Sequence, residues 1–172
     1  MLPVFVIFGG IVIVMAIIAH SGVSPVVGRV SGLDRAKGVH PELIQLLQAW
    51  NISGEFDVQV SPSGGGLRKS LQDTEFGSNA TNLAETPHGR GGALDVWPIG
   101  FDPYKTLMSQ PYVMEQMRIF GHFAKAKGFV WGGDWQNFKV TDAQKRGIDP
   151  PGDWPHIEMK NWRSLPFPPP EY

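Results

Sequence analysis

The sequence predicts an α+β fold, in which a small antiparallel sheet with flanking helices is preceded by an N-terminal transmembrane helix. Three observations support this prediction. The chain has 172 residues, which is enough for one domain with an ordinary hydrophobic core. Beyond residue 40, segments with apolar residues at helical spacing are interspersed with short strand-like ones, as is typical of α+β proteins. At the N-terminus, residues 1–19 contain no charged side chain.

The two expected helices have recognisable start and stop signals. Pro41 suits a first helical turn, apolar residues follow at helical spacing as far as Trp50, and Gly54 ends the helix. In residues 112–127 apolar side chains again recur at helical spacing, and Gly128 follows as a cap. Short strands are expected at residues 56–60, 93–97, 129–131 and 155–159.

Residues 1–21 are interpreted as a transmembrane anchor or a signal segment. As a helix, the uncharged run would be about 28 Å long, close to the ~30 Å of a bilayer core. A signal peptide cleaved after Ser21 is an alternative, because Ala19 and Ser21 are small residues at suitable positions. A buried core helix is a third interpretation, although such helices are rarely apolar on every face. The chain then divides into residues 1–21, a linker over residues 22–39, and one domain over residues 40–172.

Charge and cysteine content narrow the kinds of site that the chain can hold. The formal net charge is −1, which gives no general reason to expect nucleic-acid binding. The chain has no cysteine, and this excludes disulfides and thiolate zinc sites. Any metal site must therefore be built from His, Asp and Glu side chains.

His88 and Asp95 lie in a glycine-rich stretch that can bring them to the same point. Three glycines between them prevent a stable helix, so we expect a tight turn leading into the strand at residues 93–97. On that strand Asp95 shares a face with the small Ala93, which leaves room for a metal ion. The turn can return His88 over the same face. One nitrogen and one oxygen ligand at one point suit zinc.

A second cluster, in residues 153–158, supplies a third ligand. Pro155 stiffens the approach to His156, and on a strand His156 and Glu158 point the same way. Two histidines and one carboxylate leave the fourth tetrahedral position for water, which is the open arrangement of a catalytic zinc site. Asp153 is then expected to act as the general base, and Glu158 to orient a ligand.

The motif His88-x-x-Gly91-x-Ala93-x-Asp95, followed by Asp153-x-x-His156, resembles the zinc D,D- and L,D-peptidases of bacteria and phages. That group includes D-Ala-D-Ala carboxypeptidases and phage endolysins that cut the L-Ala-D-Glu bond. The stretch Gly-Phe-Val-Trp-Gly-Gly-Asp-Trp at residues 128–135, and the later Pro-His-Ile-Glu, look like the endolysin branch in particular. The resemblance covers roughly residues 40–160, and it implies the Hedgehog/D,D-peptidase fold.

The resemblance implies specific roles for five residues. His88, Asp95 and His156 would bind Zn²⁺, and Asp153 would be the catalytic base. Arg68 stands in the place of an upstream arginine of the family and would stabilise the oxyanion of the tetrahedral intermediate. The implied protein is a zinc metallopeptidase that hydrolyses peptidoglycan stem peptides at the L-Ala-D-Glu bond, as cell-wall-lysing endolysins do.

Two departures from the endolysin pattern leave the bond open. Residues 139–152 intervene before the second cluster, and Leu67 replaces the usual aromatic residue before Arg68. One alternative is a D-Ala-D-Ala carboxypeptidase. Another is a non-catalytic, zinc-stabilised wall-binding module of a virion, since the same zinc geometry recurs in the Hedgehog signalling domain. Asp153 at the base position favours an enzyme.

The expected partners follow from these interpretations. They are the peptidoglycan stem peptide, the membrane through the N-terminal helix and, in a virion, other virion proteins, with no nucleic acid. The expected location is the host inner membrane or a virion membrane, with the catalytic domain facing the cell wall, or secretion after cleavage.

Overall fold

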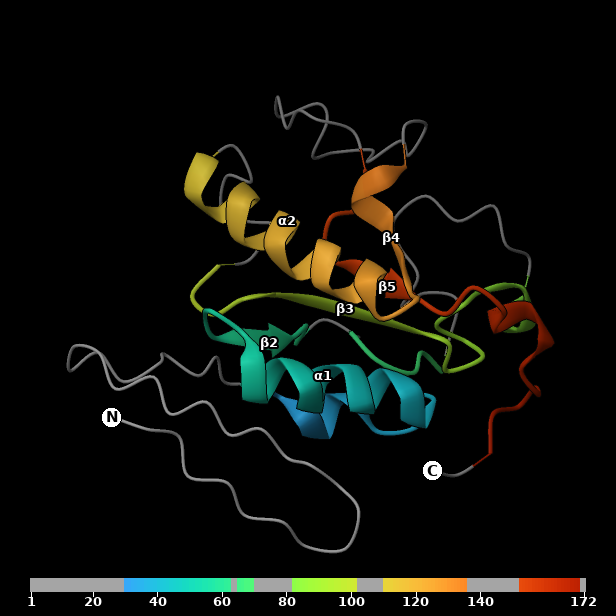
Figure 1. Cartoon of the computed structure of the whole chain (residues 1–172). Helices are drawn as coiled ribbons and strands as arrows, with labels where there is room; N and C mark the ends of the chain where they lie inside the picture. Colours follow the sequence, from blue (N-terminus) through green and yellow to red (C-terminus); the bar gives the residue numbers. More distant parts are fainter. Residues whose placement is uncertain (1–29, 63–64, 70–81, 102–109, 136–151, 171–172) are drawn as a thin grey trace, which may run out of the picture.

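The computed structural model describes residues 30–62, 65–69, 82–101, 110–135 and 152–170, which form an α+β domain as predicted (Figure 1). Its elements in chain order are strand β1 (Val30–Ser31), 3-10 helix η1 (Leu33–Ala36), helix α1 (Pro41–Ser53), strand β2 (Val58–Val60), 3-10 helix η3 (Leu83–Glu85), strand β3 (Ala93–Pro98), helix α2 (Pro111–Ala126), strand β4 (Val130–Trp131), 3-10 helix η4 (Gly132–Asp134), strand β5 (His156–Glu158) and 3-10 helix η5 (Trp162–Ser164).

Both predicted helices are confirmed, and local chemistry sets their boundaries. Pro41 occupies the first turn of α1, where His40 Nδ1 accepts a hydrogen bond from the Glu42 N–H at 3.4 Å. The helix ends at Ser53, and the N–H of the next residue, Gly54, donates to the carbonyl of Trp50 in the last turn. After α2, Gly128 adopts a φ of 96°, a left-handed conformation that glycine reaches without steric cost.

The strands form a five-stranded sheet in the described residues, with the order β1-β2-β3-β5-β4. β2, β3, β5 and β4 pair antiparallel with their neighbours, whereas β1 runs parallel to β2. In the central β3–β5 pair, Asp95 lies directly opposite His156, and Ala93 lies opposite Glu158. Directly opposed residues on one face have Cβ atoms about 5 Å apart. This register therefore brings two distant parts of the chain to one point.

The predicted fold class is wrong in two respects. The sheet is mixed rather than antiparallel, because α1 provides the crossover that lets β1 and β2 run parallel. The prediction of a transmembrane helix is also wrong: within the described ranges, no helix is long and apolar enough to cross a bilayer. The longest, α2, has 16 residues, about 24 Å, and carries Glu115, Arg118 and Lys125.

The N-terminal anchor had been predicted from residues 1–21, which lie outside the described residues. The predicted membrane partner and the membrane-anchored location depended on that helix, and they are corrected with it. In the segment predicted as a linker, residues 30–39 carry β1, η1 and the buried Ala36 and Val39. The boundaries of the domains themselves stay a prediction.

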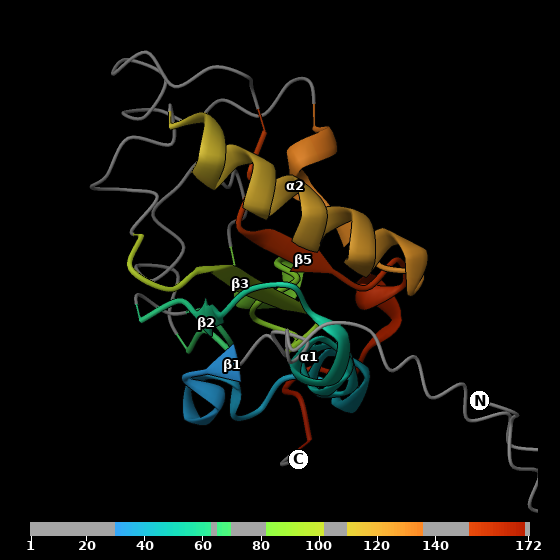
Figure 2. The same ribbon diagram turned by 60° about the vertical axis from the view of Figure 1, so that its left-hand side comes forward.

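Both helices pack on one face of the sheet, which leaves the other face for the site (Figure 1, Figure 2). Trp50 of α1 contacts Phe120 and Phe123 of α2, with ring centroids 5.0 and 5.1 Å apart. Leu94 and Val96 of β3 join this hydrophobic core. Since side chains alternate along a strand, Asp95 between them points to the opposite face.

Candidate metal centre

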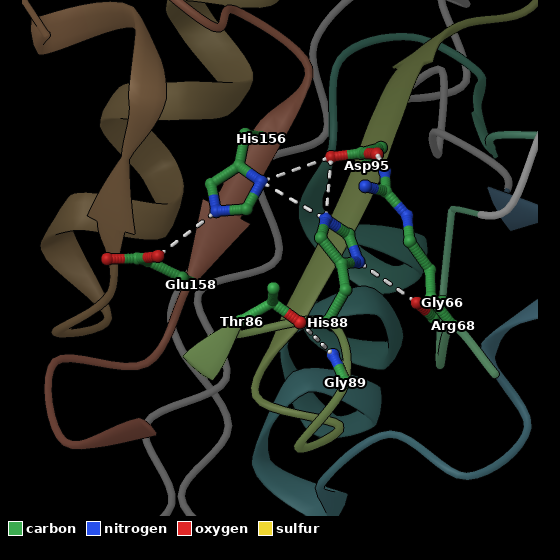
Figure 3. Close-up of polar contacts among 8 residues, drawn as sticks. All are labelled: Gly66, Arg68, Thr86, His88, Gly89, Asp95, His156 and Glu158. Atoms are coloured by element: carbon green, nitrogen blue, oxygen red, sulfur yellow. Dashed lines mark hydrogen bonds and ion pairs between the residues drawn. The ribbon is translucent and has the colours of Figure 1, made fainter. Parts of the chain in front are cut away.

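Three side chains from the face opposite the helices converge on one point (Figure 3). His88 comes from the turn before β3, Asp95 from β3 and His156 from β5. His88 Nε2, His156 Nδ1 and Asp95 Oδ1 lie 3.2 Å from one another in each of the three pairs. All three residues are at least 96% buried, and together they could hold a metal ion.

The donor set fits a tetrahedral zinc ion. With bonds of about 2.0 Å, neighbouring ligand atoms around such an ion lie about 3.3 Å apart. The three distances of 3.2 Å match one triangular face of that tetrahedron. Three protein ligands leave the fourth position for water or substrate, as in catalytic zinc sites.

The partners of the two imidazole rings show where their protons lie. His88 Nδ1 is 2.9 Å from the carbonyl oxygen of Gly66, and His156 Nε2 is 3.1 Å from Glu158 Oε2. Carbonyls and ionised carboxylates can only accept, so a neutral ring carries its proton on these outward nitrogens. With both rings neutral, the inward nitrogens and Asp95 Oδ1 direct lone pairs at one another, and either a proton or a metal ion between them relieves the repulsion.

Thr86 shapes the turn that carries His88. Its buried hydroxyl donates to the Leu83 carbonyl at 2.9 Å. The same hydroxyl accepts the Gly89 N–H at 2.9 Å (Figure 3). Gly91 then takes a φ of 68°, a left-handed conformation that favours glycine. The glycine-rich sequence thus forms the tight turn that was predicted, and this turn directs the His88 ring over Asp95.

Arg68 borders the cluster and forms an ion pair with one of its members. Arg68 Nη2 is 2.6 Å from Asp95 Oδ2, and the Arg68 N–H donates to the His88 carbonyl at 3.4 Å. Asp95 therefore directs Oδ1 at the histidines and Oδ2 at the guanidinium. The Arg68 side chain is 15% exposed, so solvent reaches part of it.

Asp153 lies beside His156 and is held there by Gly132. The Asp153 N–H donates to the Gly132 carbonyl at 2.9 Å, and the His156 N–H donates to the Asp153 carbonyl at 3.0 Å. A Cβ at position 132 would lie 2.4 Å from the Asp153 carbonyl oxygen and 3.1 Å from the Cβ atoms of Asp153 and His156. Any side chain at position 132 would therefore push this segment away.

Burial and charge set the pKa values of His88 and Asp95. Burial lowers the pKa of His88, and the attraction of Asp95 opposes that shift. Burial alone would raise the pKa of Asp95, but the charges and hydrogen bonds of His88 and His156 hold it well below its usual value. An ionised Asp95 and a neutral His88 are the states that metal binding requires.

Asp153 and His156 titrate far from their usual values. Burial raises the pKa of Asp153 to about 7; His156 opposes this shift, and Asp95 adds to it. A carboxyl with this pKa can accept and return a proton at neutral pH. Burial lowers the pKa of His156, but hydrogen bonds to Asp95 and Glu158 outweigh this and raise it to about 10. A proton therefore competes with a metal ion for this ring.

The structure brings together the site residues that the sequence predicted. His88, Asp95 and His156 form one cluster, Asp153 adjoins it, and Arg68 contacts Asp95. Their functional roles stay predictions. Of the insertion at residues 139–152, only Gly152 lies within the described residues.

Sequence reasoning missed the backbone contributions of Gly66 and Gly132. Gly66 acts through its carbonyl, and Gly132 through its carbonyl and its lack of a Cβ. Because these contributions come from the backbone, residue type gives no direct signal of them. The Gly-Gly pair at residues 132–133 was the available signal for Gly132, but by itself such a pair indicates only a turn.

Residues 79–144 match a family model described as D-alanyl-D-alanine carboxypeptidase. This segment is similar to that family. The match spans less than half of the 172 residues; it includes His88 and Asp95 and ends before Asp153 and His156. It agrees with the resemblance to zinc peptidases that act on peptidoglycan and does not distinguish the endolysin branch. No curated protein matches the chain.

Proposed function

We propose that this chain is a zinc-dependent peptidase that hydrolyses peptide bonds in peptidoglycan stem peptides. The observation that carries the proposal is the buried cluster of two inward-facing nitrogens and one carboxylate oxygen, 3.2 Å apart in each pair. A cluster of this kind beside a carboxyl with a pKa of about 7 suits hydrolysis better than a structural metal site. The match of residues 79–144 supports the substrate class.

His88 Nε2, Asp95 Oδ1 and His156 Nδ1 would hold the zinc ion. When bound, zinc supplies a Lewis acid that polarises the scissile carbonyl and lowers the pKa of water at the open position. The protein contributes by keeping these three atoms in place. Backbone and carboxylate acceptors behind the two rings fix their orientation, as is usual around catalytic zinc.

Asp153 is the general base and then the general acid. Its carboxylate takes a proton from the attacking water and delivers it to the amine nitrogen as the C–N bond breaks. One water is consumed, and a carboxylic acid and an amine are released. Arg68 assists with its positive charge, which stabilises the negative charge that develops on the carbonyl oxygen. The partial exposure of its side chain supports access to substrate.

We propose the L-Ala-D-Glu bond as the one that is cut. The Trp-Gly-Gly-Asp-Trp sequence at residues 131–135 supports this choice, because it resembles the endolysin branch. In the structure, Gly132 of this sequence lies against Asp153, and the Trp135 ring lies 5.0 Å from the His156 ring. A second candidate is a D-Ala-D-Ala carboxypeptidase, which the description of the matching family model favours.

Product analysis tests these proposals. The full chain is incubated with purified peptidoglycan, with and without a chelator, and the products are identified by mass spectrometry. We expect new peptides with N-terminal D-Glu, lost on chelation and restored by zinc. Release of free D-Ala instead would establish the carboxypeptidase. The Asp153→Asn variant is the control for contaminating hydrolases. A chain that binds zinc but cleaves nothing would refute the peptidase proposal and favour a wall-binding module.

A further inference from the structure

The two histidines of the cluster present different nitrogens and rest on different partners. His88 directs Nε2 inward and has the neutral carbonyl of Gly66 behind it. His156 directs Nδ1 inward and has the carboxylate of Glu158 behind it. A carboxylate holds the ring proton more strongly than a neutral carbonyl does, because the bond is assisted by charge. The orientation of His156 therefore depends on Glu158 in particular.

Glu158 is placed so that its charge acts on His156. It lies two residues further along β5, so both side chains leave the same face of the strand. Its cross-strand neighbours are Ala93 on β3 and Val130 on β4, and the small Ala93 leaves space beside the His156 ring. In the described part of the chain, no arginine or lysine pairs with Glu158, and its side chain is 15% exposed. Its negative charge is thus weakly screened at the His156 ring.

We propose that Glu158 is a positioning residue for the metal ion. It keeps the His156 proton on Nε2, so that Nδ1 binds the ion. The inference rests on the proposed function, because it takes zinc as the ion that the three ligands hold. It adds a residue whose contribution is to metal affinity rather than to contact with the substrate.

The test compares zinc affinity in two isosteric variants of the full chain. Glu158→Gln removes the charge, and its amide NH₂ can turn toward Nε2, which would move the ring proton onto Nδ1. Glu115→Gln is the matched control, because Glu115 is 50% exposed on α2 and pairs with Arg118. Competition with a chromogenic chelator should show about 10- to 100-fold weaker zinc binding in Glu158→Gln than in the wild type. Glu115→Gln should bind zinc as the wild type does.

A spectroscopic readout separates positioning from a general loss of structure. In the zinc-loaded wild type, ¹H–¹⁵N correlation of the His156 ring should show a protonated Nε2 and a zinc-bound Nδ1. Glu158→Asp keeps the charge on a shorter side chain and should lose less affinity than Glu158→Gln. Unchanged affinity in Glu158→Gln, or zinc bound through His156 Nε2, would overturn the inference while the proposed function stands. A wild-type chain that binds no zinc would overturn both.

Discussion

Replacing Gly132 with alanine tests whether the contact between the η4 segment and Asp153 sets the position of the proposed catalytic base. An added Cβ would lie 2.4 Å from the Asp153 carbonyl oxygen, whereas ordinary contacts begin at 3.4 Å. The Asp153 backbone must therefore retreat by about 1 Å. A misplacement of that size in an active site costs about 100-fold in rate. The contact with His156 Cβ, at 3.1 Å, requires a shift of only a few tenths of an ångström.

We therefore expect Gly132→Ala to lower kcat about 100-fold while zinc affinity changes less than about 10-fold. Steady-state hydrolysis of a soluble muropeptide gives kcat, and competition with a chelator gives the affinity. Gly100→Ala is the control, because its Cβ would meet nothing within 4 Å, although its φ of 88° strains any side chain. It should lower the melting temperature but leave kcat unchanged. A Gly132→Ala variant with kcat within a few-fold of wild type would refute this reasoning.

Three further predictions concern the chemistry. Asp153→Asn should keep zinc but lower kcat about 100- to 10,000-fold, because the amide cannot take a proton. His156→Ala should lose both zinc and activity. Measuring the zinc content of each variant together with its kcat separates the two effects. The kcat should fall as pH drops through about 7, since burial raises the pKa of Asp153 to about 7 and the base must be ionised. A bound cation favours the ionised carboxylate and would move this fall in kcat to lower pH. Arg68→Ala should lower kcat about 100-fold or more through loss of an oxyanion partner, and an unchanged kcat would remove Arg68 from catalysis.

Much of the site could be predicted because short sequence motifs encode its local geometry. Three glycines between His88 and Asp95 indicated the turn, and strand alternation put Asp95 on a face away from Leu94. The proline before His156 indicated an extended backbone, and the residues that follow it form strand β5. In each case, residues close in sequence fix the conformation, so the prediction required no knowledge of tertiary contacts.

Features that depend on long-range pairing could not be predicted in the same way. Val30 and Ser31 give no strand signal of their own, and they form β1 because β2 offers a neighbouring edge. The register that places Asp95 opposite His156 is likewise a property of two strands together. The Gly66 carbonyl behind His88 is a backbone contact that residue type does not reveal.

The position of the proposed metal ligands along the chain has a consequence for stability. His88 and His156 are 68 residues apart, and the chain contains no cysteine. An ion held by both would close a long loop and act as a reversible cross-link, a role that disulfides serve in many small secreted proteins. By mass action, an ion at about 100 times its dissociation constant stabilises the folded state by about 2.7 kcal/mol. The concentration of free zinc would then set the stability of the folded domain as well as its activity.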